Sequence, residues 1–285
     1  MKQKIIIKLF QFFNKFSKNR FFRKYFFLAQ NQNKFILTKT KEIFVVNTSD
    51  KAIAKDLFVT GEFEYANIEK AYNIIKKKYK NISNYTLLDI GANIGSICIP
   101  TIVRKVLKKV IAIEPSLRSL QLLKVNTILN KVDDNIEYIC SLVGKNKKNL
   151  NFLLSEDNHG DNKVVTKKIK NSIKANSISL DYLTNKYKNK FIIKIDVQGH
   201  EGIVLSNGKR TLSKKLPLIL ELYPFYINLN KSFNKILNPL LVANYEYFYD
   251  LSEINPKKIA FNKKTILIKY NNLKKLNNFT DLLFI

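Results

Sequence analysis

Only eight glycines occur among the 285 residues of this chain, and half of them lie in two short turns that follow apolar runs. The first turn, with Gly91 and Gly95, follows residues 86–88, and the second, around residues 199–202, follows residues 191–195. Glycine permits positive φ and close approach of a ligand, and a helix that opens after such a turn offers unpaired N–H groups. Both stretches therefore predict a strand, a tight turn and a helix, with bare main chain where a nucleotide-like ligand binds.

Apolar strands and helical segments alternate from residue 86 onward. Strands separated by helices imply parallel crossovers, so the pattern predicts an α/β fold with a mostly parallel, doubly wound sheet. Pro100 lies early in one expected helix, which must kink or begin late. The predicted strands are 86–89, 110–113, 136–142, 191–195, 218–222, 245–249 and 265–268, and the predicted helices are 66–78, 95–108 and 117–129.

The chain divides into four segments. A polar insertion at about 146–190 interrupts the main one, with short strands expected at 151–154 and 177–180. Insertions at the ligand edge of a sheet often shape an acceptor pocket. The segments are 1–41, basic and amphipathic; 42–84, strands and a helix ahead of the domain; 85–270, a Rossmann-like domain; and 271–285, a C-terminal tail.

The formal net charge of +28 raises the question of a nucleic-acid partner, because clustered cations gain from counterion release on phosphates. Only five of the 50 basic residues are arginine, whereas proteins that read bases and phosphates favour the planar guanidinium. Lysine, asparagine and isoleucine are abundant, which is typical of an AT-rich coding sequence. We therefore assign most of the charge to solvated surfaces and do not expect a nucleic-acid partner.

Two cysteines, Cys98 and Cys140, lack the spacing of metal ligands. We expect two reduced thiols, no metal and a cytoplasmic location. No uninterrupted apolar stretch approaches the roughly 18 residues that span a bilayer. No small-residue cleavage site follows the cationic N-terminus, so a secretory signal is not expected.

Residues 1–41 contain basic side chains and no acid. Apolar side chains recur at helical spacing from Ile5 to Phe16, with lysines mostly off the stripe, which predicts a basic amphipathic helix. Two interpretations stay open. Residues 1–28 lie peripherally on an anionic membrane, or the stripe docks on the domain or on a second subunit. The oligomeric state does not follow from the sequence.

The first glycine turn departs from the Gly-x-Gly-x-x-Gly pattern of dinucleotide sites, because asparagine and serine occupy the second and third glycine positions. Instead, Asp89 ends the strand two residues before Gly91. A carboxylate there can pair with the cationic amino-acid end of a ligand that has no pyrophosphate. Glu114 ends the next strand, where it can accept hydrogen bonds from both hydroxyls of a ribose.

Three stretches together resemble the FkbM-type methyltransferases, a branch of the S-adenosylmethionine-dependent Rossmann-like enzymes: LDIGANIG (88–95), AIEP (112–115) and KIDVQGHE (194–201). The resemblance implies a class I methyltransferase fold with S-adenosylmethionine as cofactor. The residues alone also allow another interpretation, in which Asp89 and Glu114 cap the helices that follow them. By resemblance, the cofactor's amino-acid and sulfonium portion lies among Asp89, Gly91, Asn93 and Gly95, and its ribose on Glu114.

Methyl transfer to an alcohol is helped by a base near the acceptor, and the end of the strand at 191–195 presents three candidates. Asp196 ends a buried strand, where a charge is costly without a partner. His200 is a serviceable neutral base but can also face solvent, and Glu201 can instead cap its helix. Lys194 is expected to pair with Glu221 outside the chemistry.

The resemblance favours methylation of a hydroxyl on a sugar, a glycan or a secondary metabolite. The loop at 155–161 matches no metal-ligand spacing, so a polar surface turn or a sugar-binding lip is expected there. Two alternatives stay open: a nucleic-acid methyltransferase that uses the basic surface, although its usual motifs are absent, and a non-catalytic protein bound at a membrane surface. The acceptor itself does not follow from residue order.

Overall fold

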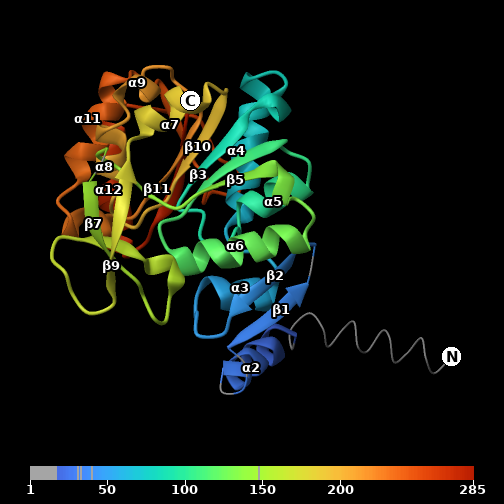
Figure 1. Ribbon diagram of the computed structural model, residues 1–285. Coiled ribbons are helices and arrows are strands. Elements are labelled where there is room, and N and C mark those ends of the chain that lie inside the picture. The colour runs from blue at the N-terminus through green and yellow to red at the C-terminus, as the bar shows by residue number, and fades with distance from the viewer. Residues whose placement is uncertain (1–17, 31, 33, 40, 147) are drawn as a thin grey trace.

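The computed structural model describes residues 18–285 except 31, 33, 40 and 147. A central sheet of eight strands carries helices on both faces (Figure 1). The strands lie in the order β13-β12-β14-β11-β10-β3-β4-β5. Their bounds are β3 (Thr86–Ile90), β4 (Lys109–Ile113), β5 (Ile136–Ile139), β10 (Phe191–Ile195), β11 (Leu218–Leu222), β12 (Tyr247–Asp250), β13 (Ile259–Ala260) and β14 (Thr280–Phe284).

The strands from β5 to β11 are parallel, and β14 runs antiparallel between β11 and β12. Every residue of β3, β10, β11 and β14 is buried, as expected for strands covered on both faces. The predicted α/β class with a mostly parallel sheet is therefore confirmed.

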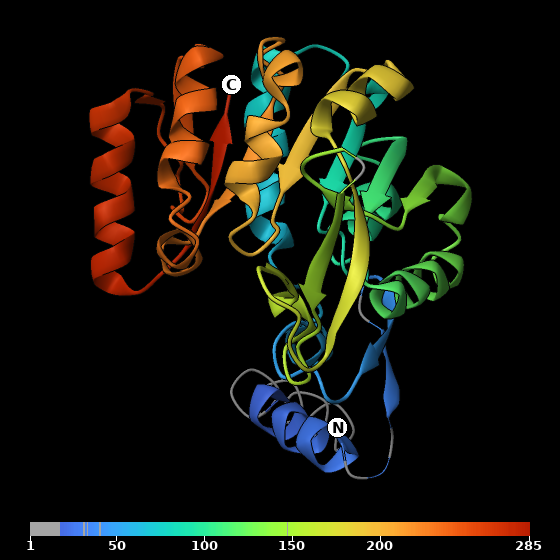
Figure 2. The same cartoon turned by 60° about the vertical axis from the view of Figure 1, so that its left-hand side comes forward.

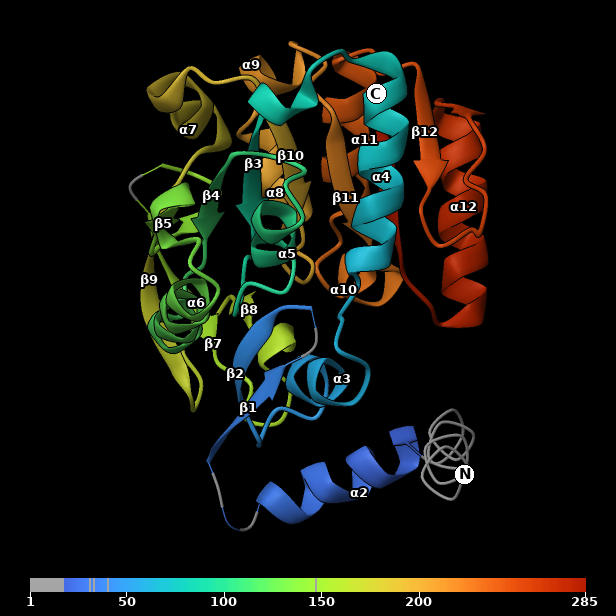
Figure 3. The same cartoon turned by 90° about the vertical axis from the view of Figure 1, so that its right-hand side faces the viewer.

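Successive residues of a strand point to opposite faces, so Leu87 and Leu88 belong to different hydrophobic layers. Figures 1 and 3 show the helices of the two layers on either side of the sheet. The first layer contains α4 (Tyr65–Lys78), α5 (Cys98–Val103) and α6 (Leu117–Leu129). The second contains α7 (Leu180–Tyr187), α8 (Glu201–Ser206), α9 (Lys209–Leu212), α10 (Pro224–Leu229), α11 (Phe233–Val242) and α12 (Lys263–Leu276).

A small N-terminal unit lies at the end of the sheet where the parallel strands finish (Figure 3). Its hairpin is held on α6, because the Val45 N–H donates to Asn126 Oδ1 at 2.7 Å and the Ile43 N–H donates to Asn130 Oδ1 at 2.9 Å. The elements of the unit are α2 (Lys18–Gln30), β1 (Phe35–Lys39), β2 (Ile43–Asn47) and α3 (Ile53–Thr60).

The insertion forms a second sheet, ordered β6-β9-β7-β8. Its loop at 155–161 reaches the N-terminal unit, where the Lys51 N–H donates to the carbonyl of Asp157 at 2.8 Å (Figure 2). The strand expected at 177–180 ends earlier, because Ser179 caps α7 by accepting from the Tyr182 N–H. The bounds are β6 (Leu142–Val143), β7 (Lys148–Leu153), β8 (Lys163–Val165) and β9 (Ser172–Ile178).

Two predicted elements near the first glycine turn are shorter than expected. The helix predicted at 95–108 is α5, which begins only at Cys98. Pro100 is its third residue, where a main-chain N–H has no acceptor within the helix. The strand predicted at 136–142 ends at Ile139, and residues 142–143 pair with the insertion instead.

The strand predicted at 265–268 is wrong, because these residues lie in α12. Asn262 caps this helix by accepting from the Thr265 N–H at 3.0 Å, and Ile266 and Tyr270 bury one side of it. The missing strand is β14, which lies within the stretch expected as a tail and pairs between two strands of the main sheet.

The amphipathic helix predicted from Ile5 to Phe16 lies outside the described residues. Within the described part of the chain, no helix combines the length and the apolar character that a bilayer crossing requires. Cys98 is a buried free thiol and Cys140 an exposed one.

Candidate active site

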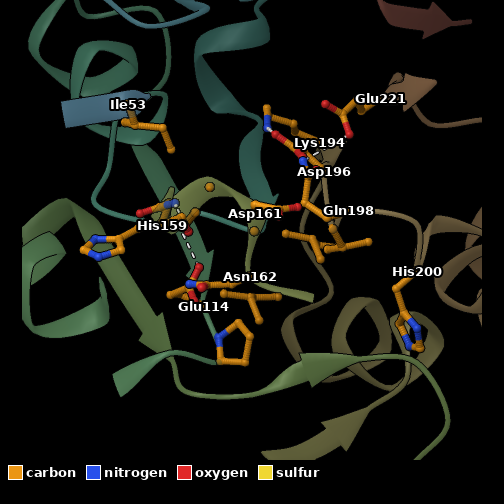
Figure 4. Close-up of a pocket in the computed structure, with 18 of the residues that line it drawn as sticks. Ile53, Glu114, His159, Asp161, Asn162, Lys194, Asp196, Gln198, His200 and Glu221 are labelled. Atoms are coloured by element: carbon orange, nitrogen blue, oxygen red, sulfur yellow. Dashed lines mark hydrogen bonds and ion pairs between the residues drawn. The ribbon is translucent and has the colours of Figure 1, made fainter. Parts of the chain in front are cut away.

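A cavity of about 370 Å³ lies where the parallel strands end. The turns after β3, β4, β10 and β11 line it, and the start of α3 and the insertion loop close it (Figure 4). Five acids line its wall: Glu64, Glu114, Asp161, Asp196 and Glu221. Lys194 is the one Lys or Arg among the lining residues.

The turn after β3 brings main chain to the cavity. Gly91 has φ +92°, and a Cβ there would lie 1.9 Å from the main-chain oxygen of Asp196, so only glycine fits between the ends of β3 and β10. Asn93 has φ +48°, and its side chain donates to the carbonyl of His159 at 3.1 Å. Gly95 does not line the cavity and packs against Leu123 of α6.

Glu114 links the first two strand ends. Its Oε2 accepts from the Asn93 N–H at 3.0 Å and its Oε1 from the Ser116 N–H at 2.7 Å. Burial raises the pKa of Glu114 to about 7, against the effect of these two N–H groups. The carboxyl lines the cavity and keeps free lone pairs, so it can accept further hydrogen bonds there.

Asp89 is 1% exposed and does not itself line the cavity. Neither of its carboxyl oxygens has a hydrogen-bond partner. Burial raises the pKa of Asp89 to about 6, and Lys194 opposes the rise. A buried carboxyl is costly without compensation. Lys194 supplies a counter-charge, and both oxygens can still accept hydrogen bonds.

Asp196 lies at the centre of the opposite wall (Figure 4). Its Oδ2 is 3.1 Å from Lys194 Nζ, and its Oδ1 accepts from Gln198 Nε2 at 2.9 Å. Gln198 Nε2 also donates to Glu221 Oε2 at 3.2 Å. The expected Lys194–Glu221 ion pair is therefore wrong, because Lys194 pairs with Asp196.

Lys194 is the cation of a buried acidic cluster. Although burial alone would lower it, the pKa of Lys194 is raised, with Asp196 and Asp89 as the largest opposing causes. Burial, followed by the charges of Asp281 and Asp196, raises the pKa of Glu64 to about 8. Several carboxyls therefore share the ammonium of Lys194 as a counter-charge, and it favours the ionised form of each.

The other two catalytic candidates lie elsewhere. His200 lines the cavity apart from Asp196 and Glu114, and burial, with the charge of Lys235, lowers its pKa to about 4 (Figure 4). Glu201 does not line the cavity. Its Oε1 accepts from the Val197 and Gly199 N–H groups at 3.1 and 3.0 Å and so holds the turn.

Sequence reasoning missed an aromatic wall formed by Tyr223, Tyr226 and Phe279. The Tyr226 hydroxyl donates to Asp161 of the insertion loop, and Lys163 Nζ lies 4.7 Å from the Tyr226 ring centre. The sequence did contain a signal for this wall, because Glu221 and Tyr223 lie at the end of β11 just as Asp196 follows the end of β10.

The insertion loop closes the cavity beside α3. His159 is buried there, and burial with the charge of Arg118 lowers its pKa to about 4. Gly160 packs against Ile53 of α3. Among the described residues, no group of three or more His, Cys, Asp or Glu side chains is arranged to hold a metal ion.

The strand order, with β14 reversed between β11 and β12, together with the cavity at the strand ends, defines a class I methyltransferase fold. The methyltransferase FkbM domain matches residues 89–247, more than half of the chain. The chain therefore belongs to the FkbM family of S-adenosylmethionine-dependent methyltransferases, and the predicted family and cofactor are confirmed.

Several solved structures are similar in outline. The methyltransferase FkbM from Methylobacillus flagellatus KT is 17% identical with a TM-score of 0.46, over 81% of this chain and 52% of that one, so this chain spans about half its length. TYW2 of M. jannaschii in complex with AdoMet is 12% identical with a TM-score of 0.44, over 89% and 86% of the two chains. A SAM-dependent methyltransferase from Agrobacterium tumefaciens is 11% identical with a TM-score of 0.42, over 88% and 70%. No curated protein matches the sequence.

Proposed function

We propose that the protein transfers a methyl group from S-adenosylmethionine to a hydroxyl of a sugar, a glycan or a secondary metabolite. The observation that carries the proposal is the contact between the two walls of the cavity. A Cβ at Gly91 would lie 1.9 Å from the main-chain oxygen of Asp196, so the expected donor turn and the expected acceptor wall share one enclosed space. Alignment within such a space is the main requirement of an in-line displacement.

The residues of the first wall fit the cofactor. Asp89 offers two buried oxygens without partners near the expected amino-acid end, and Gly91 removes the side chain that would block the main chain. Glu114 can accept from ribose hydroxyls while it holds the main chain of Asn93. When bound, S-adenosylmethionine supplies an electrophilic methyl group on a sulfonium.

On the second wall, Asp196 is the residue best placed to accept the hydroxyl proton. It lines the cavity, and Lys194 and Gln198 fix its carboxylate by contacts of 3.1 and 2.9 Å. His200 is the second candidate, but it lines the cavity apart from Asp196 and Glu114 (Figure 4). Glu201 contributes by holding the turn that carries both.

The lining favours an uncharged acceptor over nucleic acid. Five acids and one lysine line the cavity, and this lysine pairs with Asp196, so a phosphodiester would find no free Lys or Arg among the described lining residues. The aromatic wall of Tyr223, Tyr226 and Phe279 offers flat apolar surface, on which one face of a sugar ring can pack. The basic charge of the chain lies outside this cavity, and it does not argue for a nucleic-acid acceptor.

Calorimetric titration with S-adenosylhomocysteine tests the donor site. Glu114→Gln and Asp89→Asn remove charge at two expected contacts, and we expect affinity to fall by about 10-fold or more for each, because a hydrogen bond to a charged group contributes about 1.5–3 kcal/mol. Glu69→Gln, on the exposed side of α4, is the matched control and keeps wild-type affinity. Heat of binding absent from the wild-type protein contradicts the proposal.

A second experiment tests the transfer itself. The protein is incubated with S-adenosylmethionine and a panel of monosaccharides, glycans and hydroxylated metabolites, and release of S-adenosylhomocysteine is followed. Asp196→Asn is expected to bind the donor and to lose transfer, whereas Asp134→Asn, an exposed substitution, retains both. Donor binding without transfer to any acceptor would support a non-catalytic protein instead.

A further inference from the structure

Helix α2 has apolar side chains on two sides. Its inner side packs on α3, where the rings of Phe22 and Phe26 each lie 5.8 Å from Phe58. On the outer side, Phe21 is 66% and Leu28 58% exposed. A helix needs only one apolar side to pack on its own domain. The outer side therefore remains to be explained.

The outer side is broader than these two residues. Tyr25 is half exposed and lies between them at helical spacing, at the border of the two sides, because its ring also stacks on Phe58 at 6.0 Å. After α2 the chain enters β1, where Phe35 and Leu37 are also exposed. Figures 1 and 3 place α2 and β1 at the same end of the molecule. Clustered exposed apolar side chains of this kind mark interaction sites.

The charged residues of α2 and β1 have one sign. Arg20, Arg23 and Lys24 lie on α2, Lys39 lies on β1, and no acid occurs between residues 1 and 41. A surface that combines aromatic side chains with several cations is complementary to a lipid bilayer, which has an apolar interior beneath anionic headgroups.

A groove of about 470 Å³ adjoins the end of α2 and contains Lys34, Lys51 and Arg118, with Asp157 as its acid. Lys51 is paired with Asp157 at 2.9 Å, and among the described residues Lys34 and Arg118 have no carboxylate partner. The groove thus offers two exposed cations without a counter-ion.

The groove also holds a buried donor. Asn47 is 2% exposed, and its Oδ1 accepts from the main chain and the hydroxyl of Ser49 at 3.0 and 2.9 Å. Its Nδ2 has no acceptor, although it is buried and Asn47 lines the groove. A donor of this kind beside two cations suits an oxygen of a phosphate group.

We propose that the outer side of α2, with β1, docks on an anionic membrane surface, and that the groove receives phosphate groups of the lipids. Aromatic and leucine side chains enter the interface while the arginines and lysines meet the headgroups. Phe58 of α3 holds α2, and Ile53 of the same helix lines the cavity, so docking would hold the cavity close to the membrane surface.

Vesicle flotation of the full-length chain tests the proposal, with vesicles of phosphatidylcholine alone or mixed with phosphatidylglycerol. We expect binding only to the mixed vesicles and a loss that follows added salt. Phe21→Ser/Leu28→Ser is expected to weaken binding at least about tenfold, because each side chain contributes about 1.5 kcal/mol or more when immersed. Val242→Ser/Ile254→Ser is the matched control, since those side chains are 82% and 88% exposed elsewhere, and it binds as wild type.

The groove has its own pair of variants. Lys34→Gln/Arg118→Gln is expected to weaken vesicle binding about tenfold or more, because each cation contributes about 1 kcal/mol near an anionic surface. The control, Lys263→Gln/Lys264→Gln on α12, is expected to bind as wild type. Equal binding to both vesicle types, or full binding by Phe21→Ser/Leu28→Ser, overturns the proposal. So does a dimer in sedimentation velocity that this double variant dissolves, because a second copy then covers the surface.

Discussion

The cavity and the outer side of α2 are lined by ionisable side chains of opposite kind within one chain. The cavity has five acids and one lysine in its wall, although the chain has a formal net charge of +28. The α2 end carries arginines and lysines, and no acid lies in the sequence up to residue 41. The overall charge therefore describes the surface, whereas the cavity has a chemistry of its own.

The two regions also differ in how much free energy their charged groups cost the folded state. The acids of the cavity are removed from water, so their free energy depends on Lys194 and on a few hydrogen bonds. Exposed cations such as Arg20 and Arg23 keep their hydration and contribute little to stability. Substitutions in the cavity should therefore change folding and binding together, whereas those at the α2 end should change binding alone.

The largest effect is expected from Lys194→Met. Removal of the cation leaves Asp196 and Asp89 without a counter-charge, and we expect the free energy of unfolding to fall by about 3–5 kcal/mol. Urea denaturation at pH 8 measures it, with the exposed Lys190→Met as control. The deficit should shrink at pH 5, which lies below the pKa of about 6 that burial gives Asp89. A stable variant at pH 8 would show that the acidic cluster does not depend on this lysine.

The next effect is expected from Gly91→Ala. A Cβ would lie 1.9 Å from the main-chain oxygen of Asp196 at a φ of +92°, so the turn must move. We expect the affinity for S-adenosylhomocysteine to fall by about 100-fold, or about 2.7 kcal/mol. Gly208→Ala is the control, because the atom nearest to the added Cβ, at 2.6 Å, is a methyl group at the end of the Leu180 side chain rather than main chain. Unchanged affinity in calorimetry would separate the turn from the donor site.

The pH dependence of stability gives a smaller effect. The pKa of Glu64 is raised from its usual 4.5 to about 8, so the folded state binds more protons than the unfolded state between these values. Its contribution to stability is present below pH 4.5 and is lost as the pH rises through about 8.

Below pH 6.5, His159 and His200 make stability rise with pH, because their pKa values are lowered to about 4 in the folded state. The comparison is therefore made above pH 6.5. We expect the thermal midpoint to fall from pH 6.5 to pH 9, and Glu64→Gln to reduce the fall while the exposed Glu69→Gln does not. If the thermal midpoint falls equally with pH in Glu64→Gln and Glu69→Gln, Glu64 is ruled out as the titrating group.

The smallest effect is expected from Pro100→Ala. The third residue of α5 has no acceptor for its N–H within the helix, so alanine restores no lost hydrogen bond. We expect the free energy of unfolding to change by less than about 1 kcal/mol in urea denaturation. A larger gain in stability would indicate that proline strains this turn.

The sequence predicted those elements whose signal is local. The strands at 191–195 and 218–222 and the helix at 117–129 have the predicted bounds, because continuous apolar runs and a serine cap mark them. The run at 265–268 looks like a strand until the cap at Asn262 and the buried Tyr270 one turn later are considered.

Of the candidate site, the sequence predicted the strand ends and an insertion at the ligand edge, and it missed the residues that α3, α10 and the turn before β14 bring to the cavity. Asp196 and Glu114 follow their strands directly, so the parallel sheet brings them to one cavity. Ile53 and Phe279 reach the cavity only after the insertion and β14 have packed, and no local pattern marks them. The predicted Lys194–Glu221 pair was wrong for a different reason: Asp196, only two residues further along the chain, reaches Lys194 Nζ at 3.1 Å.

The most direct measurement is a crystal structure of the chain with S-adenosylhomocysteine. We expect the ribose hydroxyls within hydrogen-bonding distance of the Glu114 carboxyl, and the amino-acid end over Gly91 beside Asp89. A nucleoside bound elsewhere, with Glu114 still bonded only to the main chain of Asn93 and Ser116, would contradict it.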